Sequence, residues 1–399
     1  MRKLSFISGL FCLAATAGAT PASALSLSFI GQQTFATGFQ YGGTTVGGLS
    51  GIDYRPGTND FIAISDDRSQ TNAARYYTLS LGLTSAAFSS VTFTGVNTLV
   101  DTGNAPYAPL AIDPESIRAL PGGNFVYTGE GDKNNNINAF IRIANGAGHV
   151  SELALPAIFQ QTGPAGTTGL RNNLAFESVT VSPDGSTITT ATENALIQDG
   201  PAAAFGIASP SRILTFDAAT GTPGAQYVYE VDAITDPSVP SGAFSTAGLV
   251  ELLDLGGGKY LAVERSFVTG LVKPWSTTGN GIKIFEIDLA GATDVSTLAS
   301  LTGQGFTAVS KTLLLDLDTL QIPLDNIEGI SWGPTLEDGS RSLILVSDNN
   351  FSGTQFTQFL AFKVGGAVPE PASWAMMVIG FGLLGASLRQ HRAVRVAFA

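Results

Sequence analysis

The sequence is poor in the residues that most often act as nucleophiles or hold transition metals. It contains one cysteine and two histidines in 399 residues. The cysteine, Cys12, lies in an N-terminal segment that we expect to be removed, so the mature chain would contain neither a thiol nor a disulfide. One histidine, His149, lies in the body of the chain. This scarcity argues against a serine–histidine triad and against a zinc site built from histidine and cysteine.

Charged residues are also scarce, at 13% of the chain, and acidic residues outnumber basic ones. Residues 25–366 contain 15 basic and 31 acidic residues. Nucleic acids and anionic membrane surfaces repel such an acidic body, which argues against both as partners. The same charge balance is compatible with the binding of metal cations.

Segments with the spacing of long amphipathic helices are few. The chain has 47 glycines and 19 prolines, and 44% of its residues are hydrophobic. This composition is typical of turn-rich β-proteins that are large enough to bury a core. We therefore expect an all-β fold.

The N-terminus has the pattern of a secretory signal peptide. Arg2 and Lys3 precede an apolar run that extends from residue 4 to residue 17, and the small-residue site Ala22-Ser23-Ala24 follows. This order is typical of a signal peptide that is cleaved after Ala24. We expect residues 1–24 to be a signal peptide and the protein to be exported.

The C-terminus contains Pro369-Glu370-Pro371, an apolar stretch from 374 to 388, and then Arg389, Arg392 and Arg395. The stretch is short for a membrane-spanning helix, and the basic end would remain in the cytoplasm. The whole pattern resembles the PEP-CTERM sorting signal of Gram-negative bacteria. The resemblance implies transient anchoring in the inner membrane, removal by an exosortase-type enzyme, and delivery to the cell surface or extracellular matrix. We therefore assign residues 367–399 to a sorting tail with a short transmembrane segment.

One pattern recurs five times between residues 49 and 350: an apolar run, a turn rich in Gly, Pro or Asp, a second apolar run and a carboxylate. The closing carboxylates are Asp66, Glu130, Glu193, Glu264 and Asp348. Repeats of this length with several strand-like runs predict a β-propeller over residues 25–366. Five blades is the most economical count, and six is the alternative if the long fourth repeat contains another blade. The last repeat lacks one strand, which we expect the N-terminal run LSLSFIGQQTFA to supply.

The repeats also predict where the carboxylates lie. The first two strands of a blade form a hairpin, so the residue that opens the first strand and the residue that ends the second lie at the same end. The predicted pairs are Glu115 with Glu130, Glu177 with Glu193, Glu251 with Glu264, and Glu328 with Asp348, while the first blade offers Ser50 with Asp66 and Asp67. Such pairs, repeated around a ring, would raise one another's pKa values unless cations lie among them.

Two interpretations of this acidic ring compete. In the first, the ring binds Ca²⁺, because hard cations take several oxygen ligands from a rigid frame. The candidate metal ligands are Asp66, Asp67, Glu115, Glu130, Glu177, Glu193, Glu264, Glu328 and Asp348. In the second interpretation, the carboxylates cap strands or form ion pairs with nearby arginines.

Several segments resemble the phytase-like family, described as "esterase-like activity of phytase". They include GLSGIDYRPGTNDFIAISDDRS, FESVTVSPDG, VELLDLGGGKYLAVERSF and DNIEGISWGP, within residues 49–362. The resemblance implies a β-propeller. The family takes its name from alkaline phytases, whose propellers bind Ca²⁺ ions that hold the substrate phosphates.

We derive two hypotheses for the function. In the first, the protein is a Ca²⁺-dependent hydrolase of phosphate or carboxyl esters, in which a bound water attacks the ester and arginines neutralise the developing negative charge. The candidate substrate-binding residues are Arg68, Arg75, Arg171 and Arg265. In the second, it is a noncatalytic cell-surface or extracellular-matrix protein whose propeller binds polysaccharide.

Overall fold

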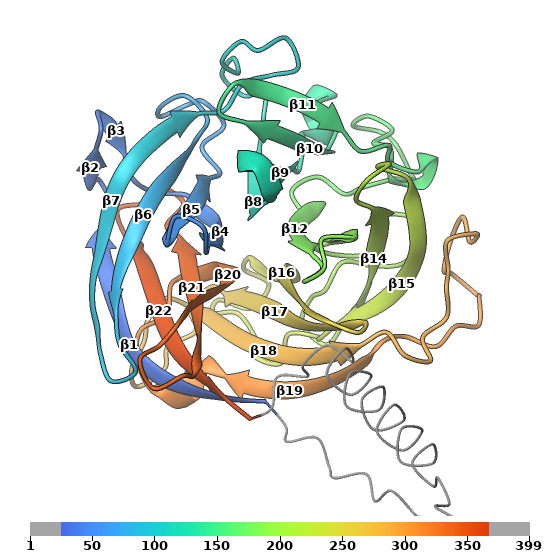
Figure 1. Cartoon of the computed structure of the whole chain (residues 1–399). Coiled ribbons are helices and arrows are strands. Elements are labelled where there is room, and N and C mark those ends of the chain that lie inside the picture. The colour runs from blue at the N-terminus through green and yellow to red at the C-terminus, as the bar shows by residue number, and fades with distance from the viewer. Residues whose placement is uncertain (1–24, 367–399) are drawn as a thin grey trace, which may run out of the picture.

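Each sequence repeat folds as a four-stranded antiparallel sheet, and the five sheets surround a central axis as the blades of a propeller (Figure 1). The computed structural model describes residues 25–366. The expected signal peptide and sorting tail, including the proposed transmembrane segment, lie outside the described residues. Within residues 25–366, no helix is long and apolar enough to cross a bilayer. The prediction of an all-β propeller with five blades is confirmed.

The strands of a blade follow one another from the axis outward (Figure 1). Blade 1 contains β4 (Leu49–Arg55), β5 (Asp60–Ser65), β6 (Arg75–Leu83) and β7 (Phe88–Thr98). Blade 2 contains β8 (Pro114–Ala119), β9 (Asn124–Gly129), β10 (Phe140–Asn145) and β11 (Gly148–Glu152). Blade 3 contains β12 (Phe176–Val181), β13 (Thr187–Thr192), β14 (Ser209–Asp217) and β15 (Pro223–Val231).

The remaining two blades complete the ring. Blade 4 contains β16 (Ser245–Gly256), β17 (Lys259–Val268), β18 (Asn280–Asp288) and β19 (Ser310–Asp316). Blade 5 contains β20 (Asn326–Thr335), β21 (Arg341–Asp348), β22 (Phe356–Gly365) and β1 (Ser26–Ala36). A small hairpin of β2 (Gln40–Tyr41) and β3 (Thr44–Thr45) and four 3-10 turns lie outside the blades: η1 (Pro121–Gly123), η2 (Lys133–Asn135), η3 (Ala157–Phe159) and η4 (Leu317–Leu320).

The turn between β16 and β17 shows how glycine sets the hairpins. Gly257 and Gly258 form a two-residue loop, and their φ angles are 66° and 80°. Two consecutive positive φ angles match the right-handed twist of the flanking strands, and glycine adopts them without steric cost. The Gly-rich segment at residues 256–258 is therefore the hairpin turn between the two inner strands of blade 4.

The length of the fourth repeat comes from loops and not from a sixth blade. Residues 289–309 connect β18 to β19, and Val295 and Leu301 in this connection pack against Val228 of β15. The connection thus covers the outside of the neighbouring blade. Its apolar residues explain why it resembles strand sequence.

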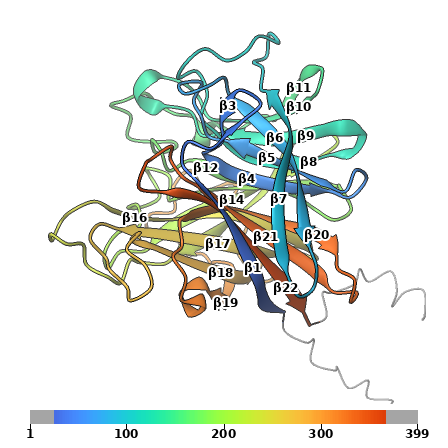
Figure 2. The same ribbon diagram turned by 90° about the vertical axis from the view of Figure 1, so that its left-hand side faces the viewer.

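The N-terminal strand closes the ring, as predicted. β1 pairs antiparallel with β22, from Ser26 opposite Gly365 to Ala36 opposite Phe356. This pairing supplies the fourth strand of blade 5 and covers an edge that would otherwise be free to pair with another chain. β1 therefore begins, and β22 ends, on one face of the ring (Figure 2). The other ends of these two strands, at Ala36 and Phe356, lie on the opposite face.

The hydrophobic core is divided among the contacts between blades. Each pair of neighbouring blades buries its own apolar cluster, such as the one formed by Ile62 and Ile64 of blade 1 with Ile117 and Tyr127 of blade 2. Burial of an aliphatic or aromatic side chain contributes about 1.5–3 kcal/mol. Stability therefore depends on every blade contacting both neighbours, which requires a closed ring.

The axis is filled where the inner strands approach most closely. A Cβ on Gly51 of β4 would lie 2.8 Å from the Cα of Ser116 on β8, so no larger residue fits there. The guanidinium group of Arg118 donates hydrogen bonds to carbonyl groups of β4, β16 and β20, at Ile52, Leu252 and Ile330. Arg118 thus links the inner strands of blade 2 to those of three other blades.

Candidate functional site

A β-bulge lies near the start of every inner strand. The pairing with the second strand shifts between Leu49 and Gly51 in blade 1, and equivalent shifts occur in the other four blades. The shift leaves one or two residues without a partner and redirects their side chains. The residues in the bulges include Ser50, Glu115, Glu177, Val250 and Glu328. Three blades therefore present a glutamate at this position.

A second set of side chains comes from the end of the second strand. Asp66, Glu130 and Glu193 directly follow β5, β9 and β13, and Asp348 is the last residue of β21. In blade 4 the equivalent residue is Arg265, which pairs with Gly248 just before the bulge. Blades 1, 2, 3 and 5 thus contribute a carboxylate at this position, and blade 4 contributes a cation.

Most of these side chains, although not those of Ser50, Glu130 and Val250, line a cavity of about 1190 Å³ on one face of the propeller. Its lining carboxylates are Asp66, Asp67, Asp113, Glu115, Glu177, Glu193, Glu328 and Asp348, and its arginines are Arg68 and Arg265. The face is the one reached by the loops that begin after Ala36 and after Asp348. It lies opposite the face at which β1 begins and β22 ends (Figure 2).

Two groups of carboxylates bring their oxygen atoms close together. Oxygens of Asp113, Glu115 and Glu130 lie within 4.8 Å of one another, and so do oxygens of Glu130, Glu177 and Glu193. Glu130 belongs to both groups. Asp113 was absent from the sequence-based set, although its position two residues before Glu115 was the available signal.

Burial and mutual repulsion raise the pKa values of this cluster. Burial is the largest cause for Glu115, followed by the negative charge of Glu177. Burial likewise raises the pKa of Asp66 well above its ordinary range, with Asp348 as the next cause. The pKa of Glu193 rises to about 7 because of burial, even though the nearby Arg265 opposes the shift. The cluster is therefore short of positive charge.

Two oxygens of the cluster are buried without a hydrogen-bond partner. Oε1 of Glu193, a residue that is 1% exposed, accepts no hydrogen bond, and neither does Oδ1 of Asp66. Buried polar atoms are nearly always paired, because an unpaired one costs about 1–3 kcal/mol. The cavity is thus built around acceptors that the chain itself leaves unsatisfied.

Arg265 and Arg68 provide the positive charge at the cavity wall. The guanidinium group of Arg265 lies 3.1 Å from Glu328 and 3.6 Å from Glu193. Arg68 pairs with Asp132 at 2.6 Å and lies 3.5 Å from Asp113. The Nε atoms of both arginines are buried and have no hydrogen-bond partner.

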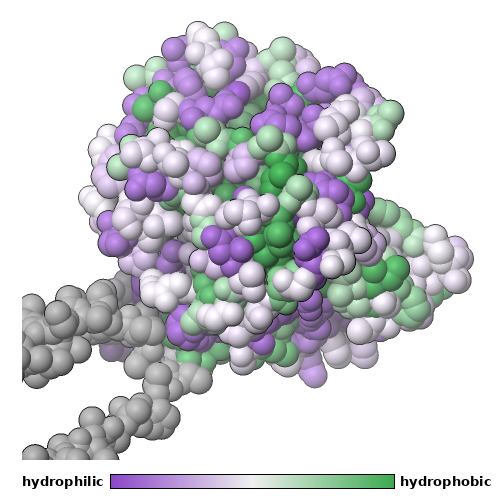
Figure 3. Space-filling view, turned by 90° about the vertical axis from the view of Figure 1, so that its right-hand side faces the viewer, coloured by the Kyte–Doolittle hydropathy of each residue, from purple (hydrophilic) through white to green (hydrophobic). Residues whose placement is uncertain are grey.

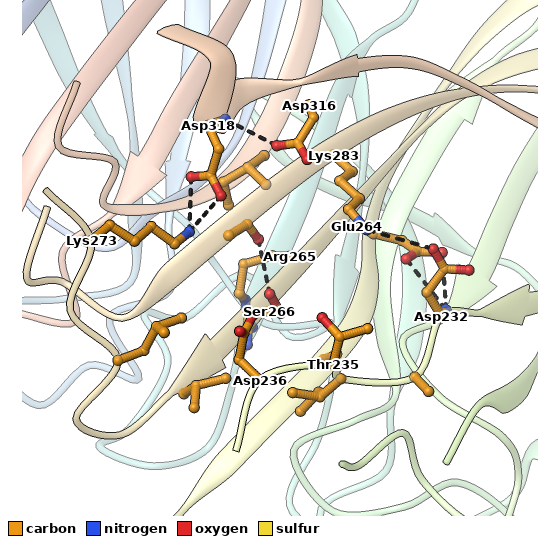
Figure 4. A pocket seen from close by; sticks show the side chains of 17 residues that line it. Asp232, Thr235, Asp236, Glu264, Arg265, Ser266, Lys273, Lys283, Asp316 and Asp318 are labelled. Atoms are coloured by element: carbon orange, nitrogen blue, oxygen red, sulfur yellow. Dashed lines mark hydrogen bonds and ion pairs between the residues drawn. The ribbon is translucent and has the colours of Figure 1, made fainter. Parts of the chain in front are cut away.

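The expected pairing of Glu251 with Glu264 does not occur. Glu251 lies one residue beyond the bulge, is fully buried at the axis, and forms an ion pair with Arg118 at 3.0 Å. Glu264 pairs with Leu249 across the hairpin and contacts Lys311 and the hydroxyl of Tyr229. It lines a smaller cavity on the flank of blade 4, beside Asp232 (Figure 4). The reason is the period of two in a strand, since a shift of one residue turns a side chain to the other face.

Three other expected site residues use their side chains in ion pairs or hydrogen bonds that stabilise the fold. Asp67 and Arg75 form an ion pair at 2.7 Å, and both side chains are 1% exposed. Arg171 donates to the carbonyl groups of Ala195 and Gly200 and is not among the residues that line the acidic cavity. Arg68 and Arg265 are thus the two expected arginines with guanidinium groups available at the cavity.

Comparisons with known proteins bear on the chain as a whole. The family model described as "Phytase-like: Esterase-like activity of phytase" matches residues 44–351, and that of the PEP-CTERM protein-sorting motif matches residues 367–393. No curated protein matches the sequence. One similar solved structure is an endo-arabinase from Bacteroides thetaiotaomicron, with 10% identity, a TM-score of 0.39, and coverage of 84% of this chain and 96% of that one. Another is the catalytic domain of a GH62 alpha-L-arabinofuranosidase from Coprinopsis cinerea, with 10% identity, a TM-score of 0.37, and coverage of 86% and 97%.

Proposed function

The chain belongs to the phytase-like family, and we propose that its acidic cavity binds Ca²⁺ and hydrolyses an ester. The ligands would come from the two groups of carboxylates that share Glu130, with Asp66, Glu328 and Asp348 across the cavity. The observation that carries the proposal is the unsatisfied oxygen of Glu193 among buried carboxylates from several blades. We leave Glu264, Asp67, Arg75 and Arg171 out of the proposed site because the fold engages their side chains.

The chemistry of the cluster fits a hard divalent cation. All candidate ligands are carboxylates, and Ca²⁺ prefers six to eight oxygen ligands. The rigid ends of different blades hold these oxygens, so little ordering would be needed on binding. Burial is the largest cause of the raised pKa values of Glu115 and Glu177, and a cation would relieve the repulsion that raises them further. The cluster is therefore more favourable with a bound cation than without one.

In the proposed reaction, the arginines orient the ester and stabilise the negative charge that develops on it. Arg265 lines the cavity and lies between Glu193 and Glu328, so its guanidinium group would hold positive charge beside a bound ester. Arg68 lies at the opposite group of carboxylates, beside Asp113. When bound, Ca²⁺ would polarise the ester and favour deprotonation of a water molecule. The carboxylates of the cavity wall are buried, and the lower dielectric constant around buried groups strengthens these electrostatic interactions.

A calcium-dependent hydrolase screen on the full chain tests the proposal. We expect calorimetry to show Ca²⁺ binding, and chelation to abolish hydrolysis of carboxyl or phosphate esters. The double variant E177Q/E328Q should lose both properties, because an amide keeps the shape but not the charge. E230Q is the matched control, since Glu230 is exposed and lies outside the cavity. Absence of Ca²⁺ binding by the unaltered chain would overturn the proposal.

The second candidate function is noncatalytic binding of polysaccharide at the cell surface. It is supported by the PEP-CTERM motif, which indicates export and a surface or extracellular location. In this case, the same cavity would bind a ligand in the presence of Ca²⁺ without turnover. The hydrolase screen separates the two candidates, because only the first predicts a released product.

The sorting motif also supports a proposal about processing. We expect cleavage after Ala24 and removal of the tail by an exosortase-type enzyme, with transient anchoring at the inner membrane before that removal. The tail follows β22, whose end lies on the face opposite the acidic cavity. While the protein is anchored, the cavity would therefore face away from the membrane. Intact-mass measurement of the exported protein tests the cleavage: a product that retains Met1 or Arg395 would contradict it.

A further inference from the structure

Aromatic side chains share the acidic cavity with the carboxylates. Phe244, Phe267 and Phe351 all line it. Phe244 is 68% exposed, although a large apolar side chain normally avoids water. A cavity that combines aromatic rings with a few polar groups is typical of a ligand-binding site. The aromatic rings therefore indicate that the ligand has an apolar face, which the carboxylates alone would not indicate.

Phe351 is held in place by an unusual backbone conformation. Its φ is 50°, in the left-handed region, which a bulky residue rarely adopts. Oδ1 of Asn349 accepts a hydrogen bond from the backbone N–H of Phe351 at 3.0 Å. The ring lies over Gly47 and Gly48, where an added Cβ would come within 2.9 Å and 2.8 Å of it. The two glycines thus leave room for a ring that the loop fixes at the cavity wall.

Phe244 belongs to an apolar lobe beside the cavity. Its carbonyl group accepts a hydrogen bond from Thr269, and its ring centroid lies 6.0 Å from that of Phe267. The exposed Val239 and Val272 lie in the same two loops, which follow β15 and β17. These loops project from the face of the propeller (Figure 2), and Figure 3 shows hydrophobic surface on the lobe that projects on that side.

The charge of the cavity selects against strongly anionic ligands. Its lining carboxylates outnumber its two arginines, Arg68 and Arg265, even when Asp67 is excluded because of its pairing with Arg75. One or two divalent cations would reduce this excess without giving the surplus of positive charge that a polyphosphate needs. Carboxylates that do not hold a cation accept hydrogen bonds from hydroxyl groups. A ligand with many hydroxyl groups and little charge fits these walls better than a polyphosphate.

We propose that the substrate is an esterified carbohydrate, whose sugar ring packs its C–H face against Phe244 or Phe351 and whose hydroxyl groups donate to the free carboxylates. This inference rests on the proposed hydrolase function and names its substrate class. In the reaction, the oxygen of water bonds to the acyl carbon, the bond from that carbon to the sugar oxygen breaks, and the sugar oxygen takes a proton. The products are a carboxylic acid and a free sugar hydroxyl group.

Three probes test the inference on the full chain with Ca²⁺: an acetylated xylo-oligosaccharide, ethyl acetate, and inositol hexakisphosphate. We expect the lowest KM for the acetylated oligosaccharide. F244A and F351A should each raise that KM about tenfold and leave the KM for ethyl acetate unchanged, because only the sugar ester contacts the rings. V239A is the matched control: Val239 is similarly exposed on the lobe, at 63%, but does not line the cavity, so both KM values should stay the same.

The outcomes separate this inference from the proposed function. Hydrolysis that prefers inositol hexakisphosphate, or that is insensitive to both phenylalanine substitutions, would overturn the substrate class and leave the hydrolase proposal standing. If no ester is hydrolysed, the hydrolase proposal fails, and calorimetry with the acetylated oligosaccharide decides the ligand class. Binding that F244A weakens about tenfold would support a carbohydrate ligand, whereas absence of binding would overturn it.

Discussion

Asp66 and Asp67 are neighbours in the chain, but their side chains lie in opposite electrostatic environments. Asp67 forms an ion pair with Arg75 and accepts hydrogen bonds from the backbone N–H groups of Gln70, Thr71 and Asn72. Asp66 faces other carboxylates, and its Oδ1 has no hydrogen-bond partner. The first arrangement stabilises a loop, and the second stores unfavourable electrostatic energy that a ligand can relieve.

The same contrast recurs between Glu251 and Glu193. Glu251 accepts a hydrogen bond from Ser116 at 2.7 Å and is paired with Arg118, so its buried charge is compensated within the axis. Glu193 is as deeply buried, but Arg265 approaches it only to 3.6 Å and shares its charge with Glu328. Burial by itself therefore does not distinguish the charge-compensated carboxylates from those of the proposed metal site, whereas the presence of a close cationic partner does.

The largest expected effect of a substitution on the free energy of unfolding comes from breaking the buried ion pair between Arg75 and Asp67. R75M should lower the free energy of unfolding by about 3–5 kcal/mol, because it leaves Asp67 charged, buried and without its partner. D66N should lower it little or raise it, since it removes a repelled charge. Chemical denaturation of both variants without Ca²⁺ makes the comparison. Equal losses in the two variants would show that the two carboxylates do not differ in role.

Calcium should stabilise the native state through the cavity. At a free Ca²⁺ concentration of 100 times Kd, mass action adds about 2.7 kcal/mol to the free energy of unfolding. The gain should persist in D254N, because Asp254 lies on β16 outside the cavity, and disappear in E177Q/E328Q. Thermal denaturation with Ca²⁺ and with a chelator measures it. A gain that survives in E177Q/E328Q would place the cation elsewhere.

The buried carboxylates at the cavity should also make stability depend on pH. Burial raises the pKa of Asp113 and of Glu193 to about 7 in the folded chain, above their ordinary values of 3.8 and 4.5. The folded state therefore binds more protons than the unfolded state between about pH 4 and pH 7, so stability falls as pH rises through that window. At about 1.4 kcal/mol per proton and pH unit, these two groups together should cost on the order of 5 kcal/mol between pH 5 and pH 7.5 without Ca²⁺. Stability that rises over this range in the metal-free chain would contradict the assignment.

The smallest effect is expected at Glu264. E264Q removes the ion pair of Glu264 with Lys311 and should lower the free energy of unfolding by about 1 kcal/mol, because Lys311 keeps Asp232 as a partner and glutamine can still accept the hydrogen bond from Tyr229. It should leave the stabilisation by Ca²⁺ unchanged, because Glu264 does not line the acidic cavity. Thermal denaturation of E264Q beside E193Q makes this test. If E264Q removes the response to Ca²⁺ and E193Q keeps it, the two residues have been assigned the wrong way round.

Much of the fold follows from local sequence patterns. The five repeats, the missing strand of the last blade and the N-terminal run that supplies it were predicted because strand alternation and turn residues act over a few positions. The convergence of Glu115, Glu177 and Glu328 on one face was predicted for the same reason. Asp113 was missed because it precedes its strand, in a segment without periodicity.

The sequence by itself determined the propeller, its closure by the N-terminal strand and the face on which acidic side chains gather, since all three depend on repeated local order. Only the tertiary structure decided which carboxylates belong together. In blade 4 the two glutamates lie one position away from the residues that face the cavity in the other blades, so that Arg265 and not Glu264 faces the cavity, and Glu251 lies at the axis. Arg118, the ion-pair partner of Glu251, comes from a distant segment of the chain, and so does Phe351, which lines the cavity. The positions of both residues depend on packing between blades, which no local sequence pattern encodes.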